Sequence, residues 1–140
     1  SLEAKARGID VVEVKEDVTP DFSGGALQLS TFGNSGSHTV AGTVFVDGDF
    51  RITSIDDFPV NVSPSRQMLF ARHRDMPGII GKLGSLLGKH NINIASMQVG
   101  RKIVRGEAVM VLSIDDPIPT NILGSILSIE GINEANSVSL

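Results

Sequence analysis

The second half of the chain alternates between two hydrophobic periods. Short apolar or β-branched runs predict four strands, at Gln67–His73, Ile92–Arg101, Glu107–Ile114 and Ile132–Leu140. Between these runs, apolar residues recur at every third or fourth position, which predicts helices over Gly78–His90 and from about Thr120 to Ser128. The order strand, helix, strand, strand, helix, strand is that of the split βαβ unit of ferredoxin-like folds. We therefore expect an α+β domain with the arrangement βαββαβ over residues 67–140.

The first half shows the strand period and almost no helical period. Alternating or β-branched runs predict strands at Ile9–Val14, Ala26–Phe32, His38–Phe45, Phe50–Ile55 and Phe58–Val62. The strongest turn signal between them is Asp47-Gly48-Asp49, because Asp-Gly tolerates the positive φ of a tight hairpin. Only Ser1–Arg7 is typical of a helix end, with Gly8 as the residue after it. We expect a mostly β partial domain whose sheet needs a partner surface.

Charge and turn residues place a boundary between the two halves. Residues 1–66 hold five Lys or Arg against ten Asp or Glu, whereas residues 67–140 hold seven against six. The change of sign coincides with Ser63-Pro64-Ser65, which is typical of a turn or linker. We therefore expect one domain over residues 1–66 and a second over residues 67–140.

Composition excludes several classes of function. The chain is acidic, with a net charge of −4, and it has no Tyr or Trp, so we expect no nucleic-acid partner. It has neither a run of eighteen apolar residues nor a charged-then-apolar leader, so we expect no membrane partner and a cytoplasmic location. Without cysteine there is no disulfide and no thiol nucleophile, and His38 and His90 have no ligand-spaced partners. We expect no metal site.

Candidate chemistry gathers at the turn before the helix expected at Gly78–His90. Asp75 and Pro77 mark a helix start, since proline suits the first helical position. The unpaired N–H groups and positive partial charge of a helix N-terminus suit a small carboxylate. The carboxylate of Asp75 and the amide of Asn93 suit an ammonium group, and His73 lies beside Asp75 in sequence. Together these groups fit a free amino acid.

Each of these residues also has a purely structural explanation. Asp75 is explained as a helix cap, His73 as an ordinary strand histidine, and Asn93 as a partner of turn backbone. The glycines at 78, 81 and 84 imitate a dinucleotide fingerprint or a KH loop, but their spacing disagrees with the first and the acidic chain with the second. A stripe of small residues lies opposite the leucine face of the same helix, which favours close approach of another backbone: Gly81, Gly84, Ser85 and Gly88.

Several motifs of the second half carry a family resemblance. They are Asp75-Met76-Pro77-Gly78-Ile79-Ile80-Gly81, Asn91-Ile92-Asn93-Ile94-Ala95 and Met97-Gln98-Val99-Gly100-Arg101. With them, the run from Leu69 to the chain end resembles the ACT domain at the C-terminus of D-3-phosphoglycerate dehydrogenases. Residues 9–66, above all Val40–Phe45 and Ile55–Val62, resemble the second half of the intervening allosteric substrate-binding domain of the long form of that family.

The resemblance implies an effector site and self-association. In that family ACT domains pair edge to edge, and L-serine, the end product of the pathway, binds at the shared interface as a feedback inhibitor. His73, Asp75 and Asn93 fall on effector-contacting positions, with the amides of Gly78, Ile79 and Ile80 beside them. Arg51 falls on one anion-binding position of the intervening domain, although Ser63 and Ser113 stand where further basic residues are expected. Arg51 is explained equally as a solvated strand residue.

The implied function is that of a regulatory, amino-acid-binding and oligomerisation region of an NAD-dependent enzyme of serine biosynthesis. The nucleotide-binding and substrate domains of that family do not occur in these 140 residues. We therefore assign no catalytic residue and no cofactor to this chain, and expect NAD and the catalytic domains as features of the parent enzyme. Two other interpretations stay open: the regulatory region of an iron–sulfur L-serine dehydratase, and an ACT oligomerisation module that binds no effector.

Overall fold

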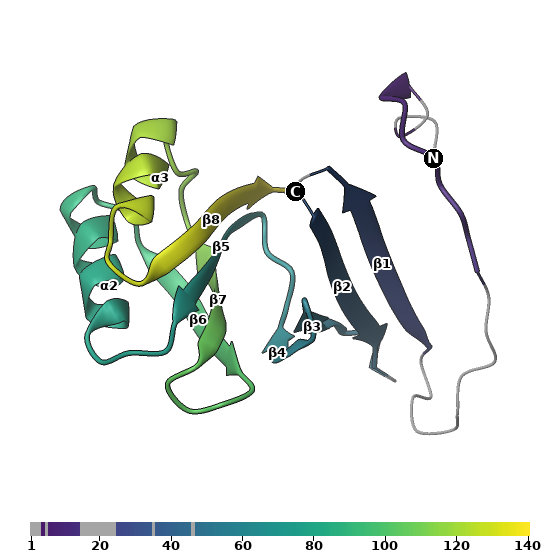
Figure 1. Ribbon diagram of the computed structural model, residues 1–140, viewed down its shortest axis with the longest axis horizontal. Coiled ribbons are helices and arrows are strands. Elements are labelled where there is room, and N and C mark those ends of the chain that lie inside the picture. The colour runs from purple at the N-terminus through teal and green to yellow at the C-terminus, as the bar shows by residue number, and fades with distance from the viewer. Residues whose placement is uncertain (1–3, 5, 15–24, 35, 46) are drawn as a thin grey trace.

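The computed structural model describes residues 4, 6–14, 25–34, 36–45 and 47–140 (Figure 1). Within these residues, eight strands form two separate antiparallel sheets of four strands each. The first sheet contains β1 (Ala26–Gly33), β2 (Gly36–Val44), β3 (Phe50–Ile55) and β4 (Phe58–Val62). The second contains β5 (Gln67–Arg74), β6 (Ile94–Arg101), β7 (Glu107–Ile114) and β8 (Ile132–Ser139), with helices α2 (Ile79–Lys89) and α3 (Thr120–Leu127).

The first sheet is a meander in the order β1-β2-β3-β4. Asp56 and Asp57, the two residues between β3 and β4, both have positive φ, of 48° and 62°. Two central residues of positive φ are what a two-residue hairpin requires, because this turn matches the twist of the flanking strands. The four strands expected between residues 26 and 62 are therefore present, with ends that shift by one or two residues.

The strand expected at Ile9–Val14 is wrong. These residues have no regular secondary structure, and Val12 and Val14 are 84% and 73% exposed. β-branched residues fit a pleated, half-buried surface, and they do not form a strand without a neighbouring strand to pair with. The helix end expected at Ser1–Arg7 lies mostly outside the described residues.

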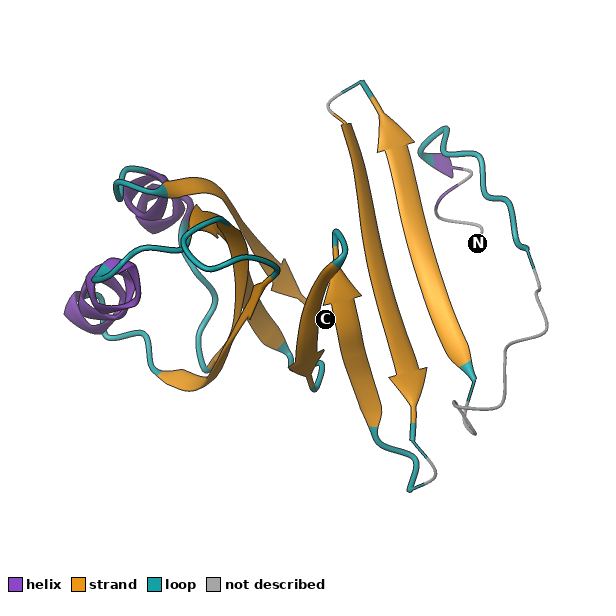
Figure 2. Cartoon of the chain, turned by 60° about the horizontal axis from the view of Figure 1, so that its bottom comes forward, coloured by secondary structure: helices purple, strands orange, loops and turns teal. Residues whose placement is uncertain are grey.

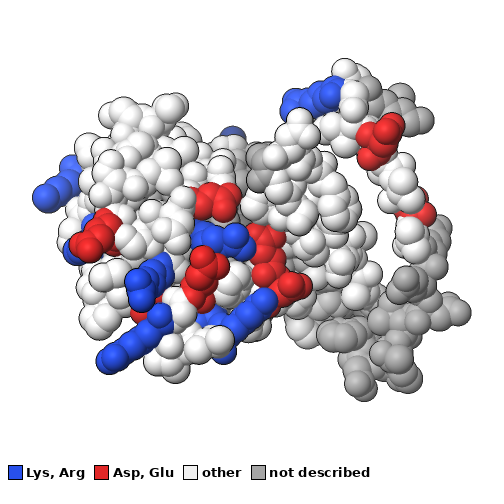
Figure 3. Space-filling model, viewed as in Figure 1, with Lys and Arg blue, Asp and Glu red and all other residues white. Residues whose placement is uncertain are grey.

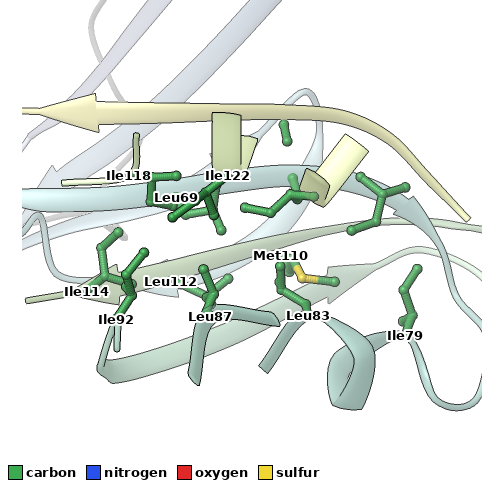
Figure 4. Close-up of a cluster of buried hydrophobic side chains, with 14 residues drawn as sticks. Leu69, Ile79, Leu83, Leu87, Ile92, Met110, Leu112, Ile114, Ile118 and Ile122 are labelled. Carbon is green, nitrogen blue, oxygen red and sulfur yellow. The ribbon is translucent and has the colours of Figure 1, made fainter. Parts of the chain in front are cut away.

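The second sheet has the order β6-β7-β5-β8, and both helices lie on one of its faces (Figure 2). This arrangement confirms the α+β, ferredoxin-like βαββαβ fold expected for residues 67–140. Side chains of β5 and β7 pack against α2 and α3 to form the main core (Figure 4). Its fully buried members are Leu69, Ala71, Leu83, Leu87, Met110, Leu112 and Ile126. No helix in the described part of the chain is long and apolar enough to cross a membrane.

The opposite face of the second sheet is covered by β4. Phe58, Val60 and Val62 of β4 form a second buried cluster with Met68, Val109 and Val111. Alternate residues of a strand point to opposite faces, so β7 contributes Val109 and Val111 to this cluster and Met110 and Leu112 to the main core. Strand β7 of the second sheet is therefore buried on both faces, by the helices on one side and by β4 of the first sheet on the other. The chain passes between them at residues 63–66, and the division into domains over 1–66 and 67–140 stays a prediction.

Gly100, near the end of β6, allows β4 to approach closely. A Cβ atom added at Gly100 would overlap the carbonyl oxygen of Pro59 and lie 2.9 Å from Cγ1 of Val60. The backbone oxygen cannot retreat without moving β4. The absence of a side chain at position 100 is thus a condition for the contact between the sheets.

We predict that Gly100→Ala lowers the free energy of unfolding by about 1–3 kcal/mol, because the added methyl overpacks the contact between β4 and β6. Gly84→Ala is the matched control, since a Cβ at Gly84 would meet nothing within 4 Å. It should stabilise helix α2 by about 0.5–1 kcal/mol. Urea unfolding followed by circular dichroism measures both changes. Equal midpoints for Gly100→Ala and the unmodified chain would show that the contact between the sheets is not tight in solution.

Candidate functional site

The turn between β5 and α2 directs the Asp75 carboxylate away from the helix. Gly78, with φ of 86°, precedes Ile79 as the N-cap residue, and no side chain caps the helix. The Asp75 carboxylate instead accepts hydrogen bonds from Nη1 of Arg101 at 2.9 Å and from the backbone N–H of Arg105 at 3.0 Å. Capping of the helix is therefore not the role of Asp75 in this structure.

Hydrogen bonding holds Asp75 in its ionised form. The backbone N–H of Arg105 and the guanidinium of Arg101, in that order, lower the pKa of the Asp75 carboxyl below its usual value of 3.8. The side chains of Asp75 and Arg101 are 22% and 53% exposed, so both charges are accessible from solvent. The turn thus presents an accessible carboxylate beside an accessible guanidinium.

His73 lies buried next to this turn, at 1% exposure. Its Nδ1–H donates to the carbonyl oxygen of Arg74 at 2.8 Å, since a carbonyl can only accept. Nε2 is buried and has no partner among the described residues. A buried polar atom without a partner costs about 1–3 kcal/mol, so Nε2 of His73 keeps an unused capacity to accept a hydrogen bond.

A hollow of about 770 Å³ opens at this end of the second sheet. It is lined by Arg74–Pro77, Arg105–Glu107, Glu130–Gly131 and Asn133. Lys, Arg, Asp and Glu side chains intersperse over the part of the surface that carries the hairpin between β6 and β7 (Figure 3). Groups of both signs within one hollow suit a ligand that itself carries both signs, such as an amino acid.

The structure brings together only some of the residues expected at the site. Asp75 lines the hollow, whereas His73, Gly78, Ile79 and Ile80 are not among the lining residues, and His73 is buried on the strand that leads to Asp75. Ile79 is buried in the main core, and Ile80 is 48% exposed. Their backbone contact with a ligand stays a prediction.

Asn93 lies at the other end of the sheet. It precedes β6, and its Nδ2 donates to Oδ2 of Asp115 at 2.7 Å. Arg101, at the far end of the same strand, contacts Asp75. Eight residue steps along a strand span about 26 Å, so Asn93 and Asp75 cannot contact one ligand within one chain.

Arg51 belongs to the first sheet and does not line the hollow that contains Asp75. It lies on β3, and its Nε donates to Oδ2 of Asp49 at 2.8 Å. With Ser63 and Ser113 it lines a separate hollow of about 290 Å³ between the two sheets. Because Asp49 already balances its charge, the structure supplies no argument for anion binding at Arg51, which stays a prediction.

Sequence patterns did not reveal the partners of Asp75 or a second polar cluster. Arg101 was noted only as part of a motif, and the backbone N–H of Arg105 carries no sequence signal. In the second cluster, Asp56 accepts from Thr39 N at 2.8 Å, from His38 Nδ1 at 3.0 Å and from Arg72 Nη2 at 3.1 Å. These contacts join β2, the turn before β4, and β5, and only the fold could bring them together.

His38 and Asp56 of this second cluster both have shifted pKa values. The hydrogen bond to Asp56, and then its negative charge, raise the pKa of His38 above 6.5. Burial opposes ionisation of Asp56, but the hydrogen bonds from His38 and Thr39 outweigh it and lower the pKa of Asp56. No group of three His, Cys, Asp or Glu in the described part of the chain is placed to hold a metal ion.

Residues 67–131 match the family model of the ACT domain, and this part of the chain has the βαββαβ fold described above. Over 140 residues the chain is 54% identical to D-3-phosphoglycerate dehydrogenase of Synechocystis sp. The aligned residues make up 100% of this chain and 25% of that relative. The chain is 35% identical over 139 residues to the enzyme of the same name from Archaeoglobus fulgidus, covering 98% of the chain and 26% of the relative.

The chain thus spans about a quarter of the length of these relatives, and the resemblance to a region of D-3-phosphoglycerate dehydrogenases is confirmed. A more distant relative is the probable L-serine dehydratase beta chain of Bacillus subtilis. It is 26% identical over 136 residues, which are 97% of this chain and 61% of that protein. Nearly the whole chain therefore aligns with proteins of two different names.

We predict that Arg101→Ala raises the pKa of Asp75 toward 3.8, because the variant loses one of the two hydrogen bonds that favour the carboxylate. Arg105→Ala is the matched control and should leave the pKa unchanged, since Arg105 contacts Asp75 through its backbone N–H. A titration of the Asp75 carboxyl ¹³C signal measures this pKa.

The same shift fixes the sign of the effect of pH on stability. The ionised form of Asp75 is favoured in the folded chain, so its contribution is present above the unfolded value of 3.8 and is lost as pH falls through the lower folded pKa. An equal Asp75 pKa in Arg101→Ala and the unmodified chain would show that the guanidinium does not interact with this carboxylate in solution.

Proposed function

We propose that this chain is the regulatory region of a D-3-phosphoglycerate dehydrogenase and that it binds L-serine, or another small amino acid, as an effector. The observation that carries the proposal is Asp75: an ionised, accessible carboxylate that caps no helix and follows, two residues on, a histidine whose Nε2 is buried and without a described partner. Catalysis, and the NAD that it uses, belong to other domains of the parent enzyme.

The ligand's ammonium group binds Asp75. Both described contacts of this side chain use Oδ2, so Oδ1 can accept from the ammonium without loss of either contact. His73 Nε2 lies near the same turn as a further acceptor for an ammonium or hydroxyl group. The helix N-terminus that begins at Ile79 adds a positive partial charge for the ligand's carboxylate.

A second copy of the chain completes the site. Within the described residues β6 pairs with β7 alone, so its outer edge is a free strand edge. If two β6 strands pair antiparallel about a two-fold axis, the first residues of one strand lie beside the last residues of the other. Asn93 of the second copy then lies near Arg101 and Asp75 of the first. This arrangement brings Asn93 to His73 and Asp75, from which it is separated in a single chain.

A second candidate function is the regulatory region of an L-serine dehydratase. The 26% identity to the probable L-serine dehydratase beta chain supports it, because the match covers nearly the whole chain. The 54% identity to the Synechocystis enzyme over all 140 residues favours the dehydrogenase. The catalytic sequence of the parent protein separates these two assignments, and the amino-acid site is common to both.

We predict that L-serine binds the chain and that Asp75→Asn weakens binding by about 1.5–3 kcal/mol, because a charged partner of the ammonium is lost. Asn93→Ala should also weaken binding. Arg51→Ala is the control on the first sheet and should leave serine affinity unchanged, since Arg51 lines a different hollow. Isothermal titration calorimetry measures the affinities, and circular dichroism checks that each variant folds.

Asp75→Asn with the serine affinity of the unmodified chain would remove Asp75 from the site. An unmodified chain that shows no heat of binding with serine would reject the proposed effector. A normal affinity in Asn93→Ala would place the site within one chain and leave the role of Asp75 intact.

We predict that the chain self-associates through the β6 edge and that light scattering at micromolar concentration gives a mass well above 14.8 kDa. Ser96→Lys places like charges across the paired edges and should return the mass toward that of one chain. Ser137→Lys introduces the same charge on β8, at the opposite edge of the sheet, and should leave the mass unchanged. A mass of one chain for the unmodified protein, or equal effects of the two lysines, would contradict pairing through β6.

A further inference from the structure

Asp75 lines the hollow of the proposed effector site, and Arg101, which contacts Asp75 but is not itself a lining residue, adds a charge of the opposite sign. We propose that Arg101 is the second recognition residue of that site: it binds the ligand's carboxylate while Asp75 binds the ammonium. The inference rests on the proposed function and names the chemical class of ligand. The site selects zwitterionic α-amino acids over simple amines and over simple carboxylates.

The fold fixes the position of Arg101. Arg101 and His73 both pair with Ala108 of β7, so the three residues form a row across the sheet at the end that carries the hollow. Gly100, the preceding residue, is buried and packs against the backbone of Pro59. The end of β6 is therefore held against β4, and the Arg101 side chain extends from a fixed backbone to Asp75.

The pair retains unused hydrogen-bonding groups on both sides. Arg101 contacts Asp75 through Nη1 alone, at 2.9 Å from Oδ2, and no other described contact uses its Nη2 or Nε. Asp75 likewise has no described contact at Oδ1. An α-amino acid carries its ammonium nitrogen and carboxylate oxygens three bonds apart. It can therefore donate to Oδ1 and accept from the guanidinium fork at the same time.

Charge balance explains the selection. A simple amine competes with Arg101 for Asp75 and so weakens the pairing of the guanidinium. A simple carboxylate competes with Asp75 for Arg101 and so weakens the pairing of the Asp75 carboxylate. A zwitterion adds an opposite charge to each member of the pair. Because both side chains are partly exposed, the existing ion pair is weak and rearranges at low cost.

Arg105 makes the role of Arg101 testable. Its backbone N–H holds Oδ2 of Asp75 at 3.0 Å whether or not a side chain is present at position 101. Removal of the Arg101 side chain therefore leaves Asp75 with one of its two anchors. The first-turn residues of α2 are the competing group for the carboxylate, and like Arg101 they are not among the residues that line the hollow.

The test compares L-serine with ethanolamine, which has the same ammonium and hydroxyl groups and no carboxylate. Serine affinity is measured by calorimetry for the unmodified chain, Arg101→Ala, Arg101→Lys and Arg105→Ala. Ethanolamine binding is followed through the Asp75 carboxyl ¹³C shift. We expect Arg101→Ala to weaken serine binding roughly 10- to 100-fold and to leave ethanolamine binding unchanged or tighter. Arg101→Lys should restore part of the serine affinity, and Arg105→Ala should leave it within about two-fold of the unmodified chain.

Three results would overturn the inference. Unchanged serine affinity in Arg101→Ala would assign the carboxylate to the α2 amides and leave the proposed function standing. Equal weakening of serine and ethanolamine would show that Arg101 only positions Asp75. An unmodified chain that binds no serine would reject the inference together with the proposed function.

Discussion

Burial of β7 on both faces is the constraint on which the rest of this structure depends. Met110 and Leu112 face the helices, while Val109 and Val111 face β4, and all four are at most 1% exposed. An antiparallel strand usually has one face toward solvent, so a strand buried on both sides requires two covering layers. The helices supply one layer and the first sheet supplies the other. The relation between the two sheets is thereby set by packing of apolar side chains, and not only by the short connection at residues 63–66.

The polar site lies where this double cover ends. β5, β6 and β7 come to an end together, and their last or first residues leave the core at Arg74, Arg101 and Glu107. The close approach of β4 at Gly100 fixes the strand end that carries Arg101, while Leu69 and Ala71 fix the strand that leads to His73 and Asp75. Accessible charges are thus attached to backbone that the core holds in place, which is the condition for a preorganised binding site.

The sequence predicted the elements whose periodicity is long and whose partners are in the chain. Helix α2 and strands β5 to β8 were placed within about two residues, because Leu83, Leu87 and the alternating residues of β7 record which face is buried. Ile9–Val14 has the same β-branched character and forms no strand, since pairing depends on a neighbour that periodicity does not reveal. Residue type also identified Asp75 as a candidate. It did not reveal Arg101 or the backbone of Arg105 as partners, because those contacts join residues 26 and 30 positions apart.

Strand β5 links the candidate site to the first sheet. Successive residues of a strand point to opposite faces, so His73 lies on the face covered by the helices and Arg72 on the face covered by the first sheet. Arg72 contacts Asp56 at the turn before β4, and its guanidinium lies 5.7 Å from the centre of the Phe58 ring. A displacement of β5 at His73 therefore also moves Arg72, the partner of Asp56 on this strand. The other partners of Asp56 are His38 and Thr39 of β2. Coupling between two sites requires an element that both of them bias. Strand β5 contacts both the candidate site, through His73, and the Asp56 cluster, through Arg72, and so meets this condition.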